Sequence, residues 1–285
     1  MTSGPDPAAT VAQLAERARR SETPCGAGSM VWRSWGAGPA LVLLHGGFGS
    51  WTHWLRNIDF FARERRVICA DLPGLGDSAA APEPYTAESI AAIVAEGLER
   101  VLEAGESFDL AGFSFGGLIG GHVAASLGAR CRTLTLVGAG GLGLLRSAMR
   151  TLRTWRHLED EAARLTLHRE NLAILMISDP AKIDPLAVYL QAQNAERGRT
   201  RSPPIARTDT LARRLPHVTA RLAGIWGERD ATAMDDLPAR ARLLRSFQPA
   251  APFLIIAEAG HWVQYEAAEA FNAALTELLR APAPG

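Results

Sequence analysis

Six short apolar runs divide the chain, and helical patterns lie between most of them. The runs cover residues 40–44, 67–70, 108–111, 134–137, 222–226 and 253–257. Their apolar positions are continuous and do not alternate with polar ones, which is typical of strands covered on both faces, as in a parallel sheet. The alternation of strand and helix predicts an α/β fold with a mostly parallel, doubly wound sheet, which residues 30–35 enter as an antiparallel edge.

The segments between these runs carry apolar side chains at helical spacing. Thr86 is placed to cap one such helix, whose apolar stripe consists of Ile90, Ile93, Val94, Leu98, Val101 and Leu102. The last segment repeats the pattern with Phe271, Leu275, Leu278 and Leu279. Both segments are predicted to be amphipathic helices that face the sheet.

The regular alternation stops between residues 141 and 215. This stretch has no strand-like run, but it has a helical pattern at 158–177 and a second one that opens with Asp184 and Pro185, a good N-cap and first helical residue. Residues 197–207 are rich in Arg, Ser and Pro and are predicted to form a loop.

These patterns predict how the chain is divided. The expected parts are a polar N-terminal arm at 1–29 with one short helix near 11–19, a core made of 30–140 and 216–285, and a helical insertion at 141–215.

Composition and charge exclude several classes of function. The 285 residues carry 30 basic and 30 acidic side chains, so the net charge is zero and neither a nucleic acid nor an anionic membrane is an expected partner. No apolar stretch reaches the roughly 20 residues of a membrane span, and we expect a soluble cytoplasmic protein. The three cysteines are scattered and the histidines show no ligand spacing, so neither a metal nor a cofactor is predicted.

The net charge of zero is the sum of two unlike parts. Residues 141–215 hold 13 basic and 8 acidic side chains, which makes the insertion basic and the rest of the chain acidic by the same amount. Most of these arginines are expected on solvated helix faces. One hypothesis is that one or two of them attract a carboxylate-bearing substrate.

The strongest chemical signal is the sequence Gly112-Phe113-Ser114-Phe115-Gly116, which directly follows one apolar run and precedes a helical segment. A G-x-S-x-G motif between a strand and a helix is typical of a nucleophile elbow, where a strained turn exposes the serine hydroxyl. The two flanking glycines are needed because strand and helix approach too closely there for side chains.

Two further residues follow in the order nucleophile, acid, histidine that such a site requires. Asp230 comes just after the run at 222–226, and His261 comes just after the run at 253–257. Because the carboxyl ends of parallel strands meet at one edge of a sheet, Ser114, Asp230 and His261 are predicted to converge there.

Five segments in this order make the chain resemble the α/β-hydrolase superfamily from about residue 31 to the last helix. They are His45-Gly46-Gly47-Phe48-Gly49, Asp71-Leu72-Pro73-Gly74-Leu75-Gly76-Asp77-Ser78, the Ser114 motif, Gly227-Glu228-Arg229-Asp230 and Gly260-His261-Trp262. The resemblance implies an α/β-hydrolase fold in which the insertion at 141–215 is a helical lid over the active site.

The expected roles combine this resemblance with the chemistry of each group. His261 takes the proton of the Ser114 hydroxyl, and Asp230 holds the imidazole in position. The backbone N–H groups of Phe115 and Gly47 are the candidate oxyanion hole, with Phe48 as the alternative to Gly47. Phe48, Phe113 and Trp262 are candidates for the substrate pocket.

Other polar residues near these motifs are interpreted as structural. Glu228 competes with Asp230 for the acid position, but the family alignment favours Asp230. His45 is expected to bond to the backbone and His122 to be packed within a helix. His53 fits either the pocket or the core, while Asp71 and Asp77 fit a turn.

The bond that is cleaved stays open between two candidates. Residues Gly260-His261-Trp262, Glu266 and Phe271-Asn272 look most like hydrolases that split carbon–carbon bonds in 2-hydroxy-6-oxo-dienoate ring-cleavage products. Those enzymes usually have Asn and Met around the nucleophile, where this chain has Phe113 and Phe115, and a lid arginine near the position of Gln191. We therefore expect a serine hydrolase of a carboxylic ester-type bond in a small acyl substrate, with the carbon–carbon hydrolase second.

Three less favoured hypotheses about function also remain open from the sequence. The same three residues support acyl transfer and perhydrolase chemistry, and the fold is sometimes reused as a ligand-binding receptor. Serine at position 114 argues against haloalkane dehalogenases and epoxide hydrolases, which need a carboxylate nucleophile there.

Overall fold

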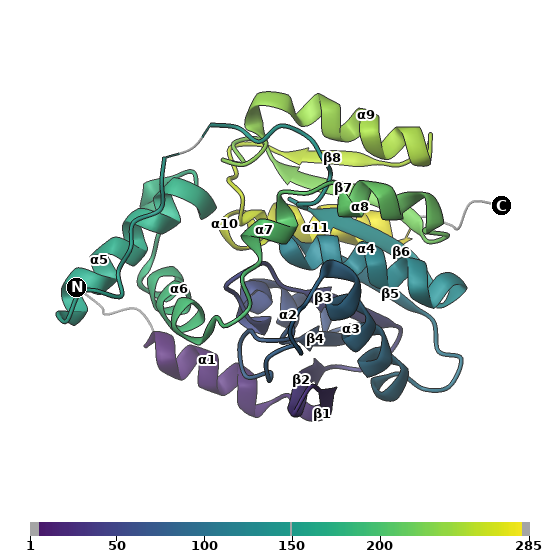
Figure 1. The fold of residues 1–285 in the computed structure, drawn as a ribbon, viewed down its shortest axis with the longest axis horizontal. Helices are drawn as coiled ribbons and strands as arrows, with labels where there is room; N and C mark the ends of the chain where they lie inside the picture. The colour runs from purple at the N-terminus through teal and green to yellow at the C-terminus, as the bar shows by residue number, and fades with distance from the viewer. Residues whose placement is uncertain (1–5, 149, 281–285) are drawn as a thin grey trace.

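The computed structural model describes residues 6–148 and 150–280, and its centre is an eight-stranded sheet (Figure 1). The strands are β1 (Arg19–Cys25), β2 (Gly28–Trp35), β3 (Ala40–Leu44), β4 (Arg66–Ala70), β5 (Phe108–Phe113), β6 (Cys131–Val137), β7 (Arg221–Gly227) and β8 (Phe253–Ile256). Their order is β1-β2-β4-β3-β5-β6-β7-β8. β2 runs antiparallel to β1 and β4, and all other pairs are parallel. The predicted mostly parallel α/β sheet is confirmed, and each of the six apolar runs forms a strand.

Helices cover the two faces of this sheet. Those of the core and N-terminus are α1 (Pro7–Glu16), α2 (Leu55–Phe61), α3 (Ala87–Val101), α4 (Phe115–Leu127), α9 (Leu237–Phe247), α10 (Val263–Glu266) and α11 (Ala268–Arg280). Thr86 caps α3 as predicted, because its Oγ1 accepts from the Ser89 N–H at 3.2 Å and the Ser89 hydroxyl oxygen accepts from the Thr86 N–H.

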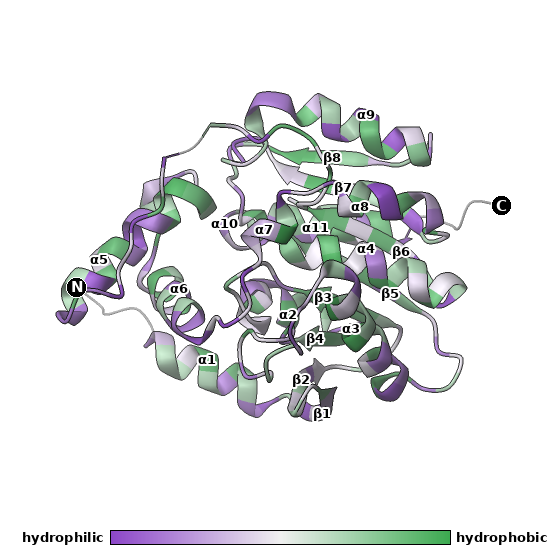
Figure 2. Ribbon diagram, viewed as in Figure 1, coloured by the Kyte–Doolittle hydropathy of each residue, from purple (hydrophilic) through white to green (hydrophobic). Residues whose placement is uncertain are grey.

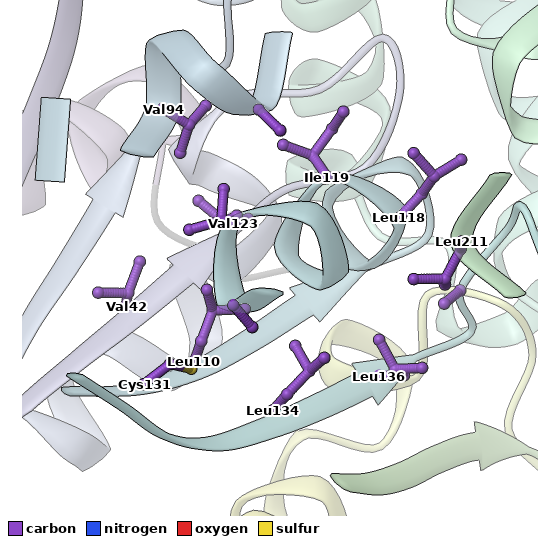
Figure 3. Close-up of a cluster of buried hydrophobic side chains, with 14 of the residues drawn as sticks. Val42, Val94, Leu110, Leu118, Ile119, Val123, Cys131, Leu134, Leu136 and Leu211 are labelled. Carbon is purple, nitrogen blue, oxygen red and sulfur yellow. The ribbon is translucent and has the colours of Figure 1, made fainter. Parts of the chain in front are cut away.

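Two apolar layers, one on each face, hold the sheet and the helices together. Along β3, Val42 and Leu44 point into the layer that contains α3 and α4, whereas Leu41 and Leu43 point into the layer that contains α2 and α11. Figure 3 shows part of the first layer, in which side chains of α4 lie between α3 and strands β5 and β6. The central strands are mainly hydrophobic, while α5 and α9 alternate between hydrophilic and hydrophobic residues (Figure 2). This burial on both faces explains why the strands have continuous apolar sequences.

Between β6 and β7 the chain forms helices and loops. The helices are α5 (Glu161–Asn171), a π-helical turn (Leu172–Met176), α6 (Pro185–Arg197), α7 (Pro203–Ala206) and α8 (Thr210–Arg214). Asp184 caps α6 and Pro185 opens it, as predicted. In Figure 1, α5 and α6 stand to the left of the sheet, and α7 lies between them and the strands. Leu172 and Leu190 bury their side chains in the same apolar layer as α2 and α11.

The structure differs from the predicted polar N-terminal arm. Residues 19–25 form the edge strand β1, which pairs with β2 along its whole length. Only Thr23 and Cys25 of this strand are buried, so its sequence shows almost no apolar signal. An edge strand is held by backbone hydrogen bonds to one neighbour, and those bonds leave no pattern in the side chains.

Within these described ranges, no helix combines the length and hydrophobicity that crossing a bilayer requires.

Candidate active site

Ser114 lies at the sharp turn between β5 and α4, at the carboxyl edge of the sheet. Its backbone has φ 52° and ψ −111°, a conformation that residues with a side chain rarely adopt. Hydrogen bonds to neighbouring segments hold the turn, because the Ser114 N–H donates to Val137 O at 2.8 Å and its carbonyl accepts from Gly140 N at 3.3 Å. The strain is therefore maintained by the packed structure around it.

The two glycines of the motif are required by close backbone contacts. A Cβ atom on Gly112 would lie 2.4 Å from the carbonyl oxygen of Gly116, and one on Gly116 would lie 2.3 Å from the carbonyl oxygen of Leu44. Both contacts are with backbone, which has no room to move aside. This is the steric reason for glycine that the sequence motif predicts.

The side chains of Ser114, His261 and Asp230 come together in one hydrogen-bonded chain. His261 Nε2 lies 3.1 Å from Ser114 Oγ, and His261 Nδ1 lies 2.8 Å from Asp230 Oδ2. Each residue follows a different strand, β5, β8 and β7 respectively. The imidazole can therefore take the serine proton on one nitrogen while the other nitrogen donates to the carboxylate.

Asp230 is completely buried, and both of its carboxylate oxygens are bonded. Oδ2 faces His261, and Oδ1 accepts from the N–H and from the hydroxyl of Thr232, each at 2.8 Å. Burial alone would raise the pKa of Asp230, but the charge of His261 and the hydrogen bonds from His261 and Thr232 hold the pKa below its ordinary value. The carboxylate is thus kept ionised beside the imidazole. Thr232 was not predicted, and its only sequence signal is its position two residues after the acid.

The N–H groups of Gly47 and Phe115, predicted as oxyanion donors, are both uncommitted. Phe115 is the first residue of α4, where a helix leaves its N–H groups without intrahelical partners. Across residues 6–148 and 150–280, no acceptor is bonded to the N–H of Gly47, of Phe48 or of Phe115. Both Gly47 and the alternative Phe48 therefore remain candidates.

His53 supports the loop that contains Gly47. Its Nδ1 accepts from the Gly46 N–H at 3.2 Å, and its ring lies against those of Phe113 and Trp262. Burial, followed by the nearby His45 and His261, holds the pKa of His53 well below its ordinary value. A neutral ring is required for this contact, because only an unprotonated nitrogen can accept a hydrogen bond.

The residues interpreted as structural have backbone or ion-pair partners away from Ser114. His45 Nε2 accepts from Leu72 N at 2.9 Å, so its Nδ1–H donates to Gly46 O at 2.7 Å. The Glu228 carboxylate accepts from Glu258 N at 3.0 Å and has no contact with His261 in the described chain. Asp71 forms an ion pair with the buried Arg33 at 3.0 Å.

A cavity of about 400 Å³ lies between the Gly47 loop and the insertion. Phe48, His53 and Gln191 contribute to its wall, together with Met176 and other residues of the insertion. Phe113 and Trp262, predicted as pocket residues, are fully buried beside the site and do not line this cavity. The Phe113 ring instead packs against His261, and the Trp262 ring packs against His53.

An eight-stranded, mostly parallel sheet with a serine on a strand–turn–helix at its carboxyl edge defines the α/β-hydrolase class. Residues 41–274 match the model of the alpha/beta hydrolase family, so the chain belongs to that family and is a hydrolase. The resemblance seen in the sequence is confirmed.

The chain is also similar to curated relatives and shares its fold with solved structures. A dihydrolipoyllysine-residue acetyltransferase component of an acetoin cleaving system from Pseudomonas putida is 31% identical over 255 residues, 85% of this chain. The chain spans only 64% of that relative's length. A 2-hydroxy-6-oxo-6-phenylhexa-2,4-dienoate hydrolase from Burkholderia cepacia is 28% identical, covering 83% of this chain and 86% of the other. A carboxylesterase from Bacillus subtilis has the same fold, with a TM-score of 0.74, 17% identity, and coverage of 96% and 95%.

Proposed function

We propose that this hydrolase cleaves a carboxylic ester-type bond in a small acyl substrate, through an acyl intermediate on Ser114. The observation that supports this most directly is the continuous hydrogen-bonded chain from Ser114 through His261 to Asp230, with distances of 3.1 and 2.8 Å. A serine hydroxyl is a poor nucleophile until a base accepts its proton, and this geometry supplies the base.

In this proposal each group acts at a stated point of the reaction. Ser114 Oγ attacks the carbonyl carbon while its proton moves to His261 Nε2, and Asp230 stabilises the resulting imidazolium. The oxyanion is bound by the N–H of Phe115 and by that of Gly47. His261 then protonates the leaving alcohol, and water, activated by the same nitrogen, releases the acid from Ser114.

The insertion at 141–215 is proposed to be the lid of this site. Its residues Leu175, Met176 and Gln191 face the Gly47 loop across the 400 Å³ cavity. A substrate that reaches Ser114 from this cavity is therefore enclosed between the insertion and the sheet.

Carbon–carbon cleavage is the second candidate, because several relatives carry that activity in their names. They include the hydrolase from Burkholderia cepacia and a 2-hydroxy-6-oxononadienedioate/2-hydroxy-6-oxononatrienedioate hydrolase from Burkholderia vietnamiensis at 29% identity. Phe113 and Phe115 around the nucleophile favour the ester hydrolase.

A substrate panel with a matched variant tests the proposal. The panel contains p-nitrophenyl esters, alkyl esters, lactones, thioesters and a 2-hydroxy-6-oxo-dienoate, each measured with the unsubstituted protein and with Ser114→Ala. We expect ester turnover to fall about 10⁶-fold in Ser114→Ala, and a fluorophosphonate to label Ser114 in the unsubstituted protein. Full ester turnover by the variant overturns the mechanism, and faster turnover of the dienoate than of any ester selects the second candidate.

Acyl transfer is separated from hydrolysis in the same assay. This separation is needed because one relative is an acetyltransferase component from Pseudomonas putida, although the chain spans only 64% of that relative. Product analysis in the presence of an added alcohol distinguishes the released acid from a new ester. Free acid as the main product supports the hydrolase.

A further inference from the structure

A second, smaller cavity lies directly against the reactive groups. It has a volume of about 40 Å³ and is lined by Ser114, His261, the glycine-rich segment 138–144, residues 206–208 and three arginines, Arg146, Arg207 and Arg240. It shares no lining residue with the 400 Å³ cavity. Since one water molecule needs roughly 10–15 Å³ by this measure, the cavity holds about three non-hydrogen atoms, the size of a carboxylate.

Of the three arginines, only Arg240 is already committed to the fold. It is buried, and its guanidinium donates to the carbonyl oxygens of Asp236 at 2.8 Å, Leu145 at 3.0 Å and Thr232 at 3.3 Å. Within the described part of the chain, the side chains of Arg146 and Arg207 have neither a hydrogen bond nor an ion pair. Both residues are partly exposed to solvent, and their donors are therefore available to a ligand.

Among the residues that the structure describes, no carboxylate forms an ion pair with Arg146 or Arg207. Partial burial, followed by the charges of Arg207 and Arg240, lowers the pKa of Arg146 against the opposing effect of Asp230. Asp230 is bonded to His261 and Thr232 and forms no ion pair with Arg146. An anion in the cavity would remove this imbalance.

The glycines of this wall shape the cavity, but their backbone N–H groups are bonded within the protein. The N–H groups of Gly138, Gly141 and Gly143 donate to Ile225 O at 3.1 Å, Ala206 O at 2.8 Å and Thr208 O at 3.2 Å. The charged donors that remain for a ligand on this side of Ser114 are the guanidinium groups of Arg146 and Arg207.

We propose that this cavity is an anion subsite, and that the substrate carries a carboxylate a few bonds from the carbonyl that Ser114 attacks. The inference rests on the proposed hydrolase function and assigns its substrate class. Guanidinium groups suit this role because their paired donors match the two oxygens of a carboxylate. The subsite is formed by the segment after β6 and the end of α7, whereas Gln191 lies in the other cavity.

The kinetic test compares two esters of equal chain length, p-nitrophenyl hemiglutarate, which carries a carboxylate, and neutral p-nitrophenyl valerate. The measured quantity is the ratio of their kcat/KM values in the unsubstituted protein, Arg146→Gln, Arg207→Gln and the double variant. Each single substitution is expected to lower the ratio by about tenfold. The control is Arg213→Gln on α8, which removes the same charge from an exposed ion pair with Asp209 and should change the ratio by less than about twofold.

A binding test separates failure of the subsite from failure of the hydrolase. Calorimetry measures the affinity of Ser114→Ala for monomethyl glutarate and for neutral dimethyl glutarate, with and without Arg146→Gln. Tighter binding of the monoanion that depends on Arg146 supports the subsite even if no ester is turned over. An unchanged ratio in both arginine variants, or equal affinity for the two glutarates, overturns it.

Discussion

Thr232 donates twice to one oxygen of Asp230, from its backbone N–H and from its hydroxyl, each at 2.8 Å. The second oxygen of Asp230 is thereby directed at His261. The carbonyl of Thr232 accepts in turn from Arg240 at 3.3 Å, so a buried arginine fixes the loop that orients the acid. The orientation of the imidazole thus depends on contacts two residues away from the reacting atoms.

Replacing Thr232 by Val keeps the shape of the side chain and removes the hydroxyl donor. Because a buried carboxylate then loses one charge-assisted hydrogen bond, we expect kcat/KM for p-nitrophenyl butyrate to fall about tenfold. Thr232→Ser restores the hydroxyl and is the matched control, expected within about threefold of the unsubstituted protein. If Thr232→Val and Thr232→Ser are equally active while both fold, the hydroxyl does not position Asp230.

The buried, neutral His53 makes the stability of the fold depend on pH. The pKa of His53 is lowered in the folded state, so below about pH 6.5 the unfolded chain binds a proton that the folded chain does not. Acidification from pH 7.5 to 5 should therefore favour unfolding. In His53→Gln the amide oxygen can still accept from Gly46. We expect this variant to lose about 1–2 kcal/mol less of its free energy of unfolding between pH 7.5 and pH 5 than the unsubstituted protein does.

Urea unfolding at pH 7.5 and at pH 5 measures this difference. The control is His157→Gln, which replaces an exposed histidine of the insertion and should leave the pH-dependent loss unchanged. An identical loss in the His53 variant and in the unsubstituted protein would show that His53 is not the group responsible.

The sequence predicts those parts of the fold and site that rest on local pattern. The run at 40–44 is apolar at every position because both faces of β3 are buried, and the order of Ser114, Asp230 and His261 follows from the order of the strand ends. Strand β1 has no such signal, because its side chains are mostly exposed.

The contacts that tune the site depend on side chains distant in sequence. Arg146 lines the same cavity as Arg207 and Arg240 because of the path that the insertion takes in the folded chain. No periodicity in the sequence predicts that path. In the same way, Phe113 and Trp262 look like pocket residues by their neighbours in sequence, but they are buried and their rings pack against His261 and His53. Such placements require the packed structure.

The turn at Ser114 should tolerate no side chain at Gly112. A Cβ atom there would lie 2.4 Å from the Gly116 oxygen and 2.6 Å from the Gly117 Cα, both of them backbone atoms. We expect Gly112→Ala to lower the free energy of unfolding by about 2 kcal/mol or more and to abolish fluorophosphonate labelling of Ser114. Gly105→Ala is the comparison, since no heavy atom lies within 4 Å of its Cβ position. The φ of Gly105 is itself positive, so this substitution should cost about 1 kcal/mol through backbone strain alone. Equal effects of the two substitutions would argue against the steric explanation.

The insertion is anchored to the loop at 71–78 by the segment at 197–202. The buried hydroxyl of Thr200 donates to Pro73 O at 2.8 Å, and the N–H groups of Arg199 and Thr200 both donate to Gly74 O. This anchor also places Ser202 so close to Gly47 that a Cβ atom on Gly47 would meet its hydroxyl at 2.0 Å. The position of the insertion and that of the oxyanion loop are therefore linked.

Thr200→Val tests this link because it leaves the Pro73 carbonyl without its partner in a buried place. We expect a loss of about 1–2 kcal/mol in unfolding free energy, faster cleavage of the insertion by a protease under native conditions, and a raised KM for p-nitrophenyl esters. Thr166→Val on α5 removes an exposed hydroxyl bond within one helix and should change none of the three. Faster proteolysis with an unchanged KM would show that the anchor holds the insertion without affecting the substrate site.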